Sequence, residues 1–434
     1  MNTFKDPTCL HRLHRRPLAV CLIALCAWSD VEAQVFTVPV LNCDDHGNNS
    51  LRDAVTSSTS GDVIDMTQLA CSTISLTTGA IVIAHAVADL TMVGPANRVL
   101  TVTGNNLSRV FLHAGDGTLT LDHMTIIDGA YLSGNVGGGC IYSSGSVALQ
   151  HSTLSDCTLN LSNPFYASGG GIFTRTNLTL NDSVLSGNQI FSVDSSARGG
   201  AAYVSGDLFA NRSSIRNNRL FAASVQSSRS ALFVLGNAQL YATTISGNQS
   251  KFDAGIRVGG NATISNSTIS GNRASIAYGG IVAYGLLTLD NSTVAFNSHN
   301  SNGPGAGIQV RYGAIVNSSI VANNTSTLNG NDYDLDVYFG PITGSNNLIN
   351  TANATLPPGT LSGNPRLVPL ADNGGPTFTH ALKSRSPAIN NGFNLHGFAF
   401  DQRQAGHPRV IGTGTDIGAF ELNTSDVIFF DNFD

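Results

Sequence analysis

Three aspartates alternate with other residues in the segment NDYDLDVY, namely Asp332, Asp334 and Asp336. If this segment is a β-strand, all three carboxylates lie on one face, because successive side chains of a strand point to opposite sides. Carboxylate oxygens are the ligands that calcium prefers. The calcium loop D-x-D-x-D-G is not completed, since Val337 stands where glycine is needed. The segment is therefore a candidate calcium site, and a solvated strand face is the alternative.

The first 33 residues are typical of a secretory signal peptide. The basic stretch 12–16 is followed by the apolar run 18–28 and by small Ala33 at the expected cleavage position. The apolar run is about 11 residues long, well short of the roughly 20 that a membrane-spanning helix needs. We therefore expect a secreted protein, extracellular or on the outer cell surface, without a transmembrane segment.

Four cysteines remain once the signal peptide is removed: Cys43, Cys71, Cys140 and Cys157. An oxidising compartment allows them to pair. Of the three pairings that four cysteines allow, proximity in sequence favours Cys43 with Cys71 and Cys140 with Cys157. Zinc is disfavoured, because the spacing contains neither C-x-x-C nor a paired histidine motif.

The chain carries few charges. Charged residues make up 12% of it, and the formal net charge is −6 at pH 7. Nucleic acids and anionic membranes are bound through clusters of lysine and arginine, which this sequence lacks. Neither is therefore an expected partner, and the polar surface must be built mainly from Ser, Thr and Asn.

One sequence unit recurs seven times between Gly138 and Thr325, each time ending in a segment like Ser/Thr-x-Ile-Ser-Gly-Asn. The aliphatic anchors of these endings are Leu154, Leu185, Ile215, Ile245, Ile269, Val294 and Ile320. Their spacing of about 24 to 31 residues is the period of a solenoid. Within each unit apolar and polar residues alternate, which indicates strands. We therefore predict an all-β fold, a right-handed parallel β-helix in a single stack with capped ends.

A further column lies three residues after each anchor. It begins with Cys157 and continues as Asn188, Asn218, Asn248, Asn272, Asn297 and Asn323. Buried asparagines stacked in register can pass amide hydrogen bonds along the column and so satisfy one another. We interpret the column as a structural ladder, in which a disulfide at Cys157 takes the place of the first amide.

The outward positions of the strands contain no cluster of acids. With Ala201 and Ala231 taken as inward residues, those of the first strand are Tyr142, Phe173, Ala202, Leu232, Arg257, Val282 and Gln309. Those of the third strand are Thr153, Val184, Ser214, Thr244, Thr268, Thr293 and Ser319. Enzymes that cleave polysaccharides on a β-helix need grouped carboxylates, so the columns argue against catalysis. The hydroxyl column, with aromatic neighbours, suits a glycan-binding surface, and plain strand propensity of threonine is the alternative.

The histidines offer no local metal or catalytic motif. The scattered ones are His85, His113, His123, His151 and His380, and no two stand four residues apart. We interpret each of them as a packing or surface residue rather than as a ligand or a base.

Both flanks of the repeats resemble known bacterial segments. Residues 36–55 resemble the CSLREA-type segment that precedes many bacterial β-helices, although the cysteine of that motif is absent here. Residues 370–392, with DQR at 401–403 and DIGAFE at 416–421, resemble the C-terminal region of secreted β-helix proteins of the choice-of-anchor type. That resemblance implies a secreted or surface β-helix and does not imply catalysis.

The chain therefore divides into five expected segments. They are a signal peptide at 1–33, an N-terminal cap with first strands at 34–93, the repeats at 94–350, a C-terminal end or cap at 351–423, and a tail at 424–434. The apolar and acidic tail is similar to C-terminal tails of secreted proteins from some Gram-negative bacteria. It is a candidate sorting signal, and a last strand that caps the solenoid is the alternative.

Taken together, the sequence predicts a secreted or surface β-helix with a structural, adhesive or glycan-binding role. The expected partner is a polysaccharide or a cell-surface glycan, and no cofactor is expected apart from the candidate calcium ion. The alternative is an extracellular polysaccharide lyase or glycoside hydrolase, of the pectate lyase or polygalacturonase type. That alternative rests on analogy between folds alone.

Overall fold

A computed structural model describes residues 35–132, 137–161, 167–192, 196–222, 228–300, 305–326 and 333–423 of the chain. The expected signal peptide, the C-terminal tail and Asp332 lie outside these residues. Within them, no helix has both the length and the apolar character needed to cross a bilayer.

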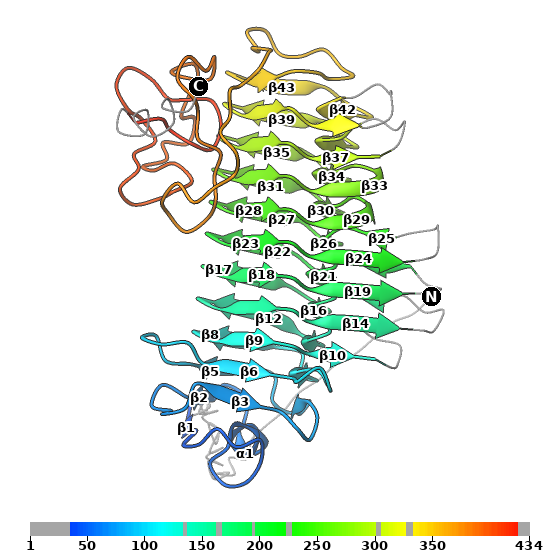
Figure 1. Ribbon diagram of the computed structural model, residues 1–434, viewed down its shortest axis with the longest axis vertical. Coiled ribbons are helices and arrows are strands. Elements are labelled where there is room, and N and C mark those ends of the chain that lie inside the picture. The colour runs from blue at the N-terminus through cyan, green and yellow to red at the C-terminus, as the bar shows by residue number, and fades with distance from the viewer. Residues whose placement is uncertain are drawn as a thin grey trace, which may run out of the picture. The chain divides into compact units, whose positions relative to one another are not determined.

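Between Thr37 and Ile349 the described chain forms short strands joined by turns, and these strands pair in parallel with their counterparts one coil on and form four long sheets (Figure 1). Sheet A contains β1 (Thr37–Pro39), β2 (Val63–Asp65), β5 (Leu90–Val93), β8 (Thr118–Asp122), β12 (Ser146–Gln150), β17 (Leu178–Asn181), β22 (Leu208–Asn211), β27 (Ala238–Tyr241), β31 (Ala262–Ser265), β35 (Leu287–Asp290), β39 (Ala314–Asn317) and β43 (Ile342–Ser345). Sheet B contains β3 (Thr73–Ser75), β6 (Thr101–Thr103), β9 (Thr125–Ile127), β13 (Thr153–Ser155), β18 (Val184–Ser186), β23 (Ser214–Arg216), β28 (Thr244–Ser246), β32 (Thr268–Ser270), β36 (Thr293–Ala295), β40 (Ile320–Ala322) and β44 (Leu348–Ile349).

The other two sheets complete each coil. Sheet C contains β4 (Ile81–Ile83), β7 (Phe111–His113), β11 (Ile141–Ser143), β16 (Ile172–Thr174), β21 (Ala202–Val204), β26 (Leu232–Val234), β30 (Ile256–Val258), β34 (Ile281–Ala283), β38 (Ile308–Val310) and β42 (Leu335–Val337). Sheet D contains β10 (Ala130–Tyr131), β14 (Thr158–Leu161), β19 (Gln189–Ser192), β24 (Arg219–Ala222), β29 (Gln249–Phe252), β33 (Arg273–Ala277), β37 (Ser298–His299) and β41 (Thr325–Ser326), with β15 (Ala167–Ser168), β20 (Ala197–Arg198) and β25 (Ser228–Arg229) on its return edge. The predicted parallel β-helix is thus confirmed.

The interior is a continuous stack of aliphatic side chains. The predicted anchors from Leu154 to Val294 are fully buried, and each pairs with its counterpart in the next coil. The last predicted anchor was wrong by one residue: Val294 pairs with Val321, and Ile320 pairs with Thr293. Both residues at this point are aliphatic, so the sequence pattern alone left the register open.

The asparagine column forms the expected ladder, with one correction. From Asn188 to Asn297, each Nδ2 donates to the Oδ1 of the next asparagine at 2.9 Å. Asn297 donates to Asn324, also at 2.9 Å, rather than to Asn323, which has a φ of 60° and forms a turn. The same one-residue insertion that moved the last anchor explains this shift. At the other end, the Cys157 N–H donates to Asn188.

The N-terminal segment holds both a disulfide and the helix expected near Leu51. The helix α1 (Leu51–Ser57) begins at Ser50, whose side chain accepts a hydrogen bond from the Asp53 N–H, as an N-cap does. Its buried residues pack on the first coils. Arg52 pairs with Asp45 at 2.7 Å and so ties the helix to the preceding loop.

Both disulfides have the expected pairing. Cys43 is bonded to Cys71, and Cys140 is bonded to Cys157. The second bond joins one coil to itself beside the ladder, because Cys157 is the residue that donates to Asn188. The bonds close loops of 28 and 17 residues, which restricts the unfolded chain.

The C-terminal region does not simply close the end of the solenoid, as we expected of residues 351–423. Leu361 still pairs with Leu348 of the last coil. The chain then turns back and lies along the outside of sheet B, as the orange and red segment in Figure 1 shows. Its docking contacts include hydrogen bonds between Thr244 Oγ1 and the Phe378 carbonyl (2.7 Å), Thr268 Oγ1 and Gln402 Oε1 (2.6 Å), and the Ala419 N–H and Thr293 Oγ1 (3.1 Å).

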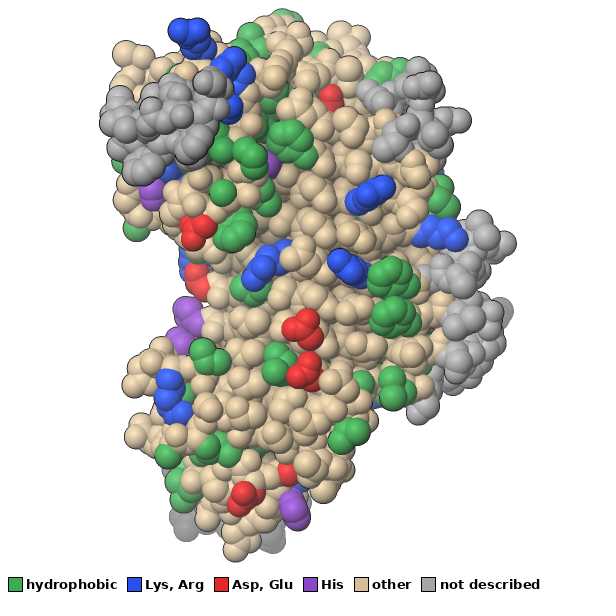
Figure 2. Space-filling model, viewed as in Figure 1, with side chains coloured by type: hydrophobic (Ala, Val, Ile, Leu, Met, Phe, Trp, Pro, Cys, Tyr) green, Lys and Arg blue, Asp and Glu red, His purple; other side chains and the backbone are tan. Residues whose placement is uncertain are grey.

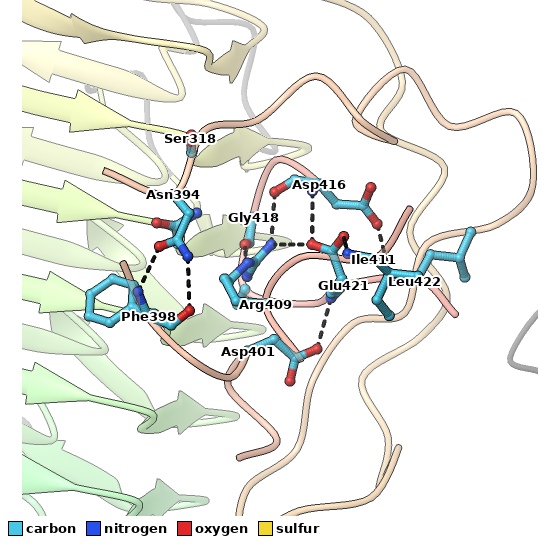
Figure 3. Close-up of polar contacts among 12 residues, drawn as sticks. Ser318, Asn394, Phe398, Asp401, Arg409, Ile411, Asp416, Gly418, Glu421 and Leu422 are labelled. Atoms are coloured by element: carbon cyan, nitrogen blue, oxygen red, sulfur yellow. Dashed lines mark hydrogen bonds and ion pairs between the residues drawn. The ribbon is translucent and has the colours of Figure 1, made fainter. Parts of the chain in front are cut away.

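A buried network of charges holds this docked region together (Figure 3). Arg409 pairs with Glu421 at 3.0 Å, and both side chains are at most 1% exposed. Glu421 Oε2 also accepts from the Asp416 N–H at 2.9 Å, and Asp401 pairs with Arg403 at 2.8 Å. Burial raises the pKa of Glu421 to about 7, against the pull of Arg409. The DQR and DIGAFE motifs therefore have a structural role in this chain.

Candidate functional site

An aromatic column runs along the outer face of sheet C, and the sequence pattern showed only half of it. Ile172 pairs with Ala202, so the residue that follows Phe173 in the outward column is Tyr203, where we expected Ala202. Likewise Phe233, rather than Leu232, faces outward in β26. Adjacent small apolar residues fit the interior equally well by pattern, which is why the predicted register slipped here by one.

The rings of this column stack in register. Tyr142, Phe173, Tyr203 and Phe233 are separated by 5.2–5.5 Å between ring centroids, and neighbouring planes differ by no more than 6°. Offset stacking at this distance is favourable. Each ring covers the face of its neighbour, so Tyr142, Phe173 and Tyr203 are only half-buried at their edges, and Phe233, beside Arg198 and Arg257, is buried.

The column changes chemistry after Phe233. In the next coils its members are Arg257, Val282, Gln309 and Asp336. At this change a cleft of about 520 Å³ opens beside the outer face of sheet C. We call it the sheet C cleft, and its lining is mainly arginine and aromatic: Arg229, Arg257, Arg311, Phe252, Tyr278, Tyr284, Tyr338 and Phe339.

The floor of the cleft is a buried carboxylate between two guanidinium groups. Asp253 Oδ2 lies 2.7 Å from Arg257 Nη1 and 3.3 Å from Arg229 Nη1. The Asp253 side chain is 1% exposed, whereas those of Arg257 and Arg229 are 14% and 31% exposed. Burial raises the pKa of Asp253, and the two arginines oppose that rise. Two cations on one anion leave this part of the cleft with an excess of positive charge.

Aromatic side chains continue the wall of the cleft. Arg257 donates to the Tyr284 hydroxyl and lies 4.3 Å from the centre of that ring. Arg311 is exposed and lies within 6 Å of the Tyr284 ring, the range of a cation–π contact. Among the described residues, Arg311 has no acidic partner within ion-pair distance. Its charge is therefore available to a bound anion.

Three rings at the rim of the cleft or beside it are open to solvent. Tyr312, Tyr338 and Phe339 are 59%, 57% and 56% exposed. Phe339 lies 6.2 Å from Tyr312, with ring planes 28° apart, and 6.3 Å from Tyr338, with ring planes 50° apart, so the three rings form one exposed group. Exposed aromatic faces grouped beside arginines are a feature of binding surfaces.

The aspartates proposed for calcium have separate roles where the structure describes them. Asp334 ends the asparagine ladder, accepting from Asn324 Nδ2 at 2.9 Å, and also accepts from Thr351. Asp336 lies in the outward column of sheet C, where Asn353 donates to it. Burial raises the pKa of both carboxyl groups. Asp332 lies outside the described residues, so the triad itself stays a prediction.

The hydroxyl column of sheet B, which we expected to form a glycan surface, is partly covered. Thr244, Thr268 and Thr293 are at most 2% exposed, because the C-terminal region lies on them. The uncovered members nearer the N-terminus are half-buried. The face seen in Figure 2 is mainly uncharged, with acids and bases scattered over its described residues.

Comparison with known proteins identifies no family for this chain. No family model and no curated protein matches this chain. A crystal structure of pectate lyase Pel9A is similar, with a TM-score of 0.40 and 14% sequence identity, over 90% of this chain and 98% of that one. A likeness this distant gives no information about activity.

Proposed function

We propose that this protein is an extracellular binding protein for an acidic polysaccharide, which it holds in the sheet C cleft. The observation that supports this proposal most is the presence of three arginines and several open aromatic rings in one cleft of about 520 Å³. The two disulfides suit an oxidising compartment, where the expected signal peptide would direct the chain.

The chemistry of the cleft matches that of an acidic glycan. The C–H faces of sugar rings are apolar and pack on aromatic rings such as Tyr338 and Phe339. Uronate and sulfate groups are planar or multidentate anions, and guanidinium groups bind such anions through paired hydrogen bonds. Neutral glycans would leave the Arg311 charge unused. The overall negative charge of the chain does not oppose this, because charges beyond about 10 Å are screened at physiological salt.

Binding is favoured over cleavage, because the carboxylates in or near the cleft already have partners within the protein. Asp253 is engaged by two arginines, and Asp336 is engaged by Asn353. Hydrolysis needs two carboxyl groups placed across a bond, and calcium-dependent elimination needs several carboxylates on one ion. Among the described residues that line the cleft, Asp253 is the only acid, and Asp336 follows Gln309 in the outward column of sheet C. A lyase or hydrolase therefore remains the alternative outcome of the experiment below.

The test is calorimetric titration of the mature protein with polygalacturonate, a sulfated glycan and neutral dextran, with and without calcium. We expect binding of the acidic glycans alone. The variant R311A should weaken it about tenfold, the effect of losing one charged hydrogen bond. The matched control is R273A, because Arg273 is equally exposed but lies in sheet D.

Two results would change the conclusion. Equal affinity for dextran would show that binding is not selective for acidic glycans. An unchanged affinity in R311A would show that the glycan is not held in the sheet C cleft. Release of unsaturated uronates or new reducing ends during the titration would instead identify a lyase or a hydrolase. Both products can be followed in the same samples, by ultraviolet absorbance and by a reducing-sugar assay.

A further inference from the structure

The turn between sheets A and B aligns one residue of each coil in a column. The preceding strands are in register, since Asp122 pairs with Gln150 and Gln150 with Asn181. The residues that follow are therefore stacked along the solenoid, each with a positive φ: His123 (53°), His151 (45°), Asp182 (47°) and Arg212 (47°). Two histidines that stand 28 residues apart in sequence thus become direct neighbours.

The two imidazole rings point at one carboxylate oxygen. Asp122 Oδ1 lies 2.7 Å from His123 Nδ1 and 3.1 Å from His151 Nδ1. The rings are stacked, with centroids 4.4 Å apart and planes 22° from parallel. One ligand atom from each of the three residues lies within 4.8 Å of the others. Among the described residues, no other group of three such side chains is this close.

From this geometry we propose that Asp122, His123 and His151 form a binding site for a divalent transition metal, with zinc as the ion it suits best. Imidazole nitrogen and carboxylate oxygen are ligands of zinc, at about 2.0–2.2 Å, and zinc accepts them in tetrahedral arrangement. Without a metal, both Nδ1 atoms can donate hydrogen to Asp122. When both Nδ1 atoms have lost their hydrogen, the two nitrogens and a carboxylate oxygen can reach one ion after the nearly parallel rings rotate about their side-chain bonds.

A second carboxylate stands behind the outer histidine. His151 Nε2 lies 3.8 Å from Asp182 Oδ2, and Asp182 is itself held by Arg212 through two hydrogen bonds to its carboxylate. A carboxylate on the far nitrogen of a histidine ligand fixes the ring orientation and raises its basicity. Asp182, supplied by the next coil along the same column, lies within ion-pair distance of Nε2 without a hydrogen bond to it, and the proposal assigns it this positioning role.

The site opens onto a small cleft rather than being closed by protein. The cleft has a volume of about 380 Å³ and is lined by His123, His151, Thr153 and the loop 95–99. The side chain of His151 is 50% exposed, whereas that of Asp122 is 22% exposed. Three protein ligands leave one position of a tetrahedral zinc ion open, as in sites where the metal exchanges small ligands. The proposal is independent of the sheet C cleft, which lies on another sheet.

The test is titration of tag-free, chelator-treated mature protein with zinc chloride in a calorimeter. We expect one ion per chain, with binding abolished in the double variant H123A/H151A. The matched control is H85A, because His85 is also exposed, and it should bind zinc like the wild type. The variant D182N should bind zinc about 10- to 100-fold more weakly, as loss of an outer carboxylate does.

Cobalt(II) gives a second measurement that does not depend on the variants folding. Added to wild-type protein, it should produce the visible absorption of a tetrahedral ion with nitrogen and oxygen ligands, and zinc should displace it. The proposal is overturned if wild-type protein takes up neither ion, or if H123A/H151A, shown to be folded by circular dichroism, binds zinc as the wild type does.

Discussion

Sheets B and C each carry an outward column, yet part of the sheet B column lies under the C-terminal region, whereas the sheet C column leads to a cleft. The threonines of sheet B hold the C-terminal region of the same chain through hydrogen bonds to Phe378 and Gln402. The outer column of sheet C, from Tyr142 to Asp336, leads along the solenoid to a cleft lined by arginine and aromatic side chains. A column of side chains that points away from the solenoid is therefore exposed to solvent only where no other segment of the chain lies over it.

The largest effect is expected from removing Arg409, which should release the C-terminal region from the outer face of sheet B. The variant R409A leaves buried carboxylates without their cation, a change that typically costs about 3–5 kcal/mol. We expect residues 364–423 to become sensitive to limited proteolysis while the coils keep their circular dichroism spectrum. The control is R385A, at an exposed arginine of the same region. Unchanged proteolysis in R409A would show that the network does not hold the region in place.

The free energy of unfolding that Glu421 contributes in the docked C-terminal region should decrease as the pH rises. The pKa of Glu421 is raised from 4.5 to about 7 in the folded protein, so folding favours its protonated form. The stabilisation is complete below pH 4.5 and is lost as pH rises through about 7, by up to about 3 kcal/mol. The measurement is the difference in unfolding free energy between wild type and E421Q at pH 5 and pH 8. Parallel curves for the two proteins would contradict the prediction.

Loss of one threonine hydroxyl should reduce stability more in the covered part of sheet B than in its uncovered part. T268V removes the donor to Gln402 and leaves a buried amide oxygen unsatisfied, which costs about 1–3 kcal/mol. T153V changes the same column where no chain lies over it, and should stay within about 0.5 kcal/mol of wild type. Urea unfolding of both variants gives the comparison. Equal losses of unfolding free energy in the two variants would mean that the hydrogen bond from Thr268 does not stabilise the docked C-terminal region.

The open face should show the smallest effect on stability. F339A truncates a ring that is 56% exposed, so the free energy of unfolding should change by less than about 0.5 kcal/mol. Binding of polygalacturonate should nevertheless weaken in F339A and not in F221A, which truncates an exposed ring on sheet D. A large loss of stability in F339A would assign that ring to the packing of the solenoid.

The repeat made most of the fold predictable, because each column position imposes one kind of side chain. Prediction failed where neighbouring residues were chemically alike: Asn323 beside Asn324, Ala201 beside Ala202, and Ala231 beside Leu232. In each case either residue satisfies the column, and only pairing with the next coil decides between them. The slip at Ala202 also concealed half of the aromatic column.

The other misses concern contacts between coils and between distant segments. His123 and His151 each stand three residues before an inward aliphatic residue, Ile126 and Leu154, so extending the anchor column by one coil would have aligned them. No such signal exists for the docked C-terminal region. Its contacts from Thr244 to Phe378 and from Thr268 to Gln402 each join residues 134 positions apart, outside the repeat, so they emerge only from the folded chain.

The asparagine ladder has a direction, and this has a consequence for how such a protein can grow. Between side chains, every ladder amide donates to the next coil, toward the C-terminus, and the last acceptor, Asp334, has no amide group with which to continue the ladder. At the other end Cys157 is engaged in its disulfide and offers only its backbone N–H. Gene duplication can therefore lengthen the protein by inserting whole coils between Asn188 and Asn324. Coils added beyond either terminus of the ladder would find no partner to continue it.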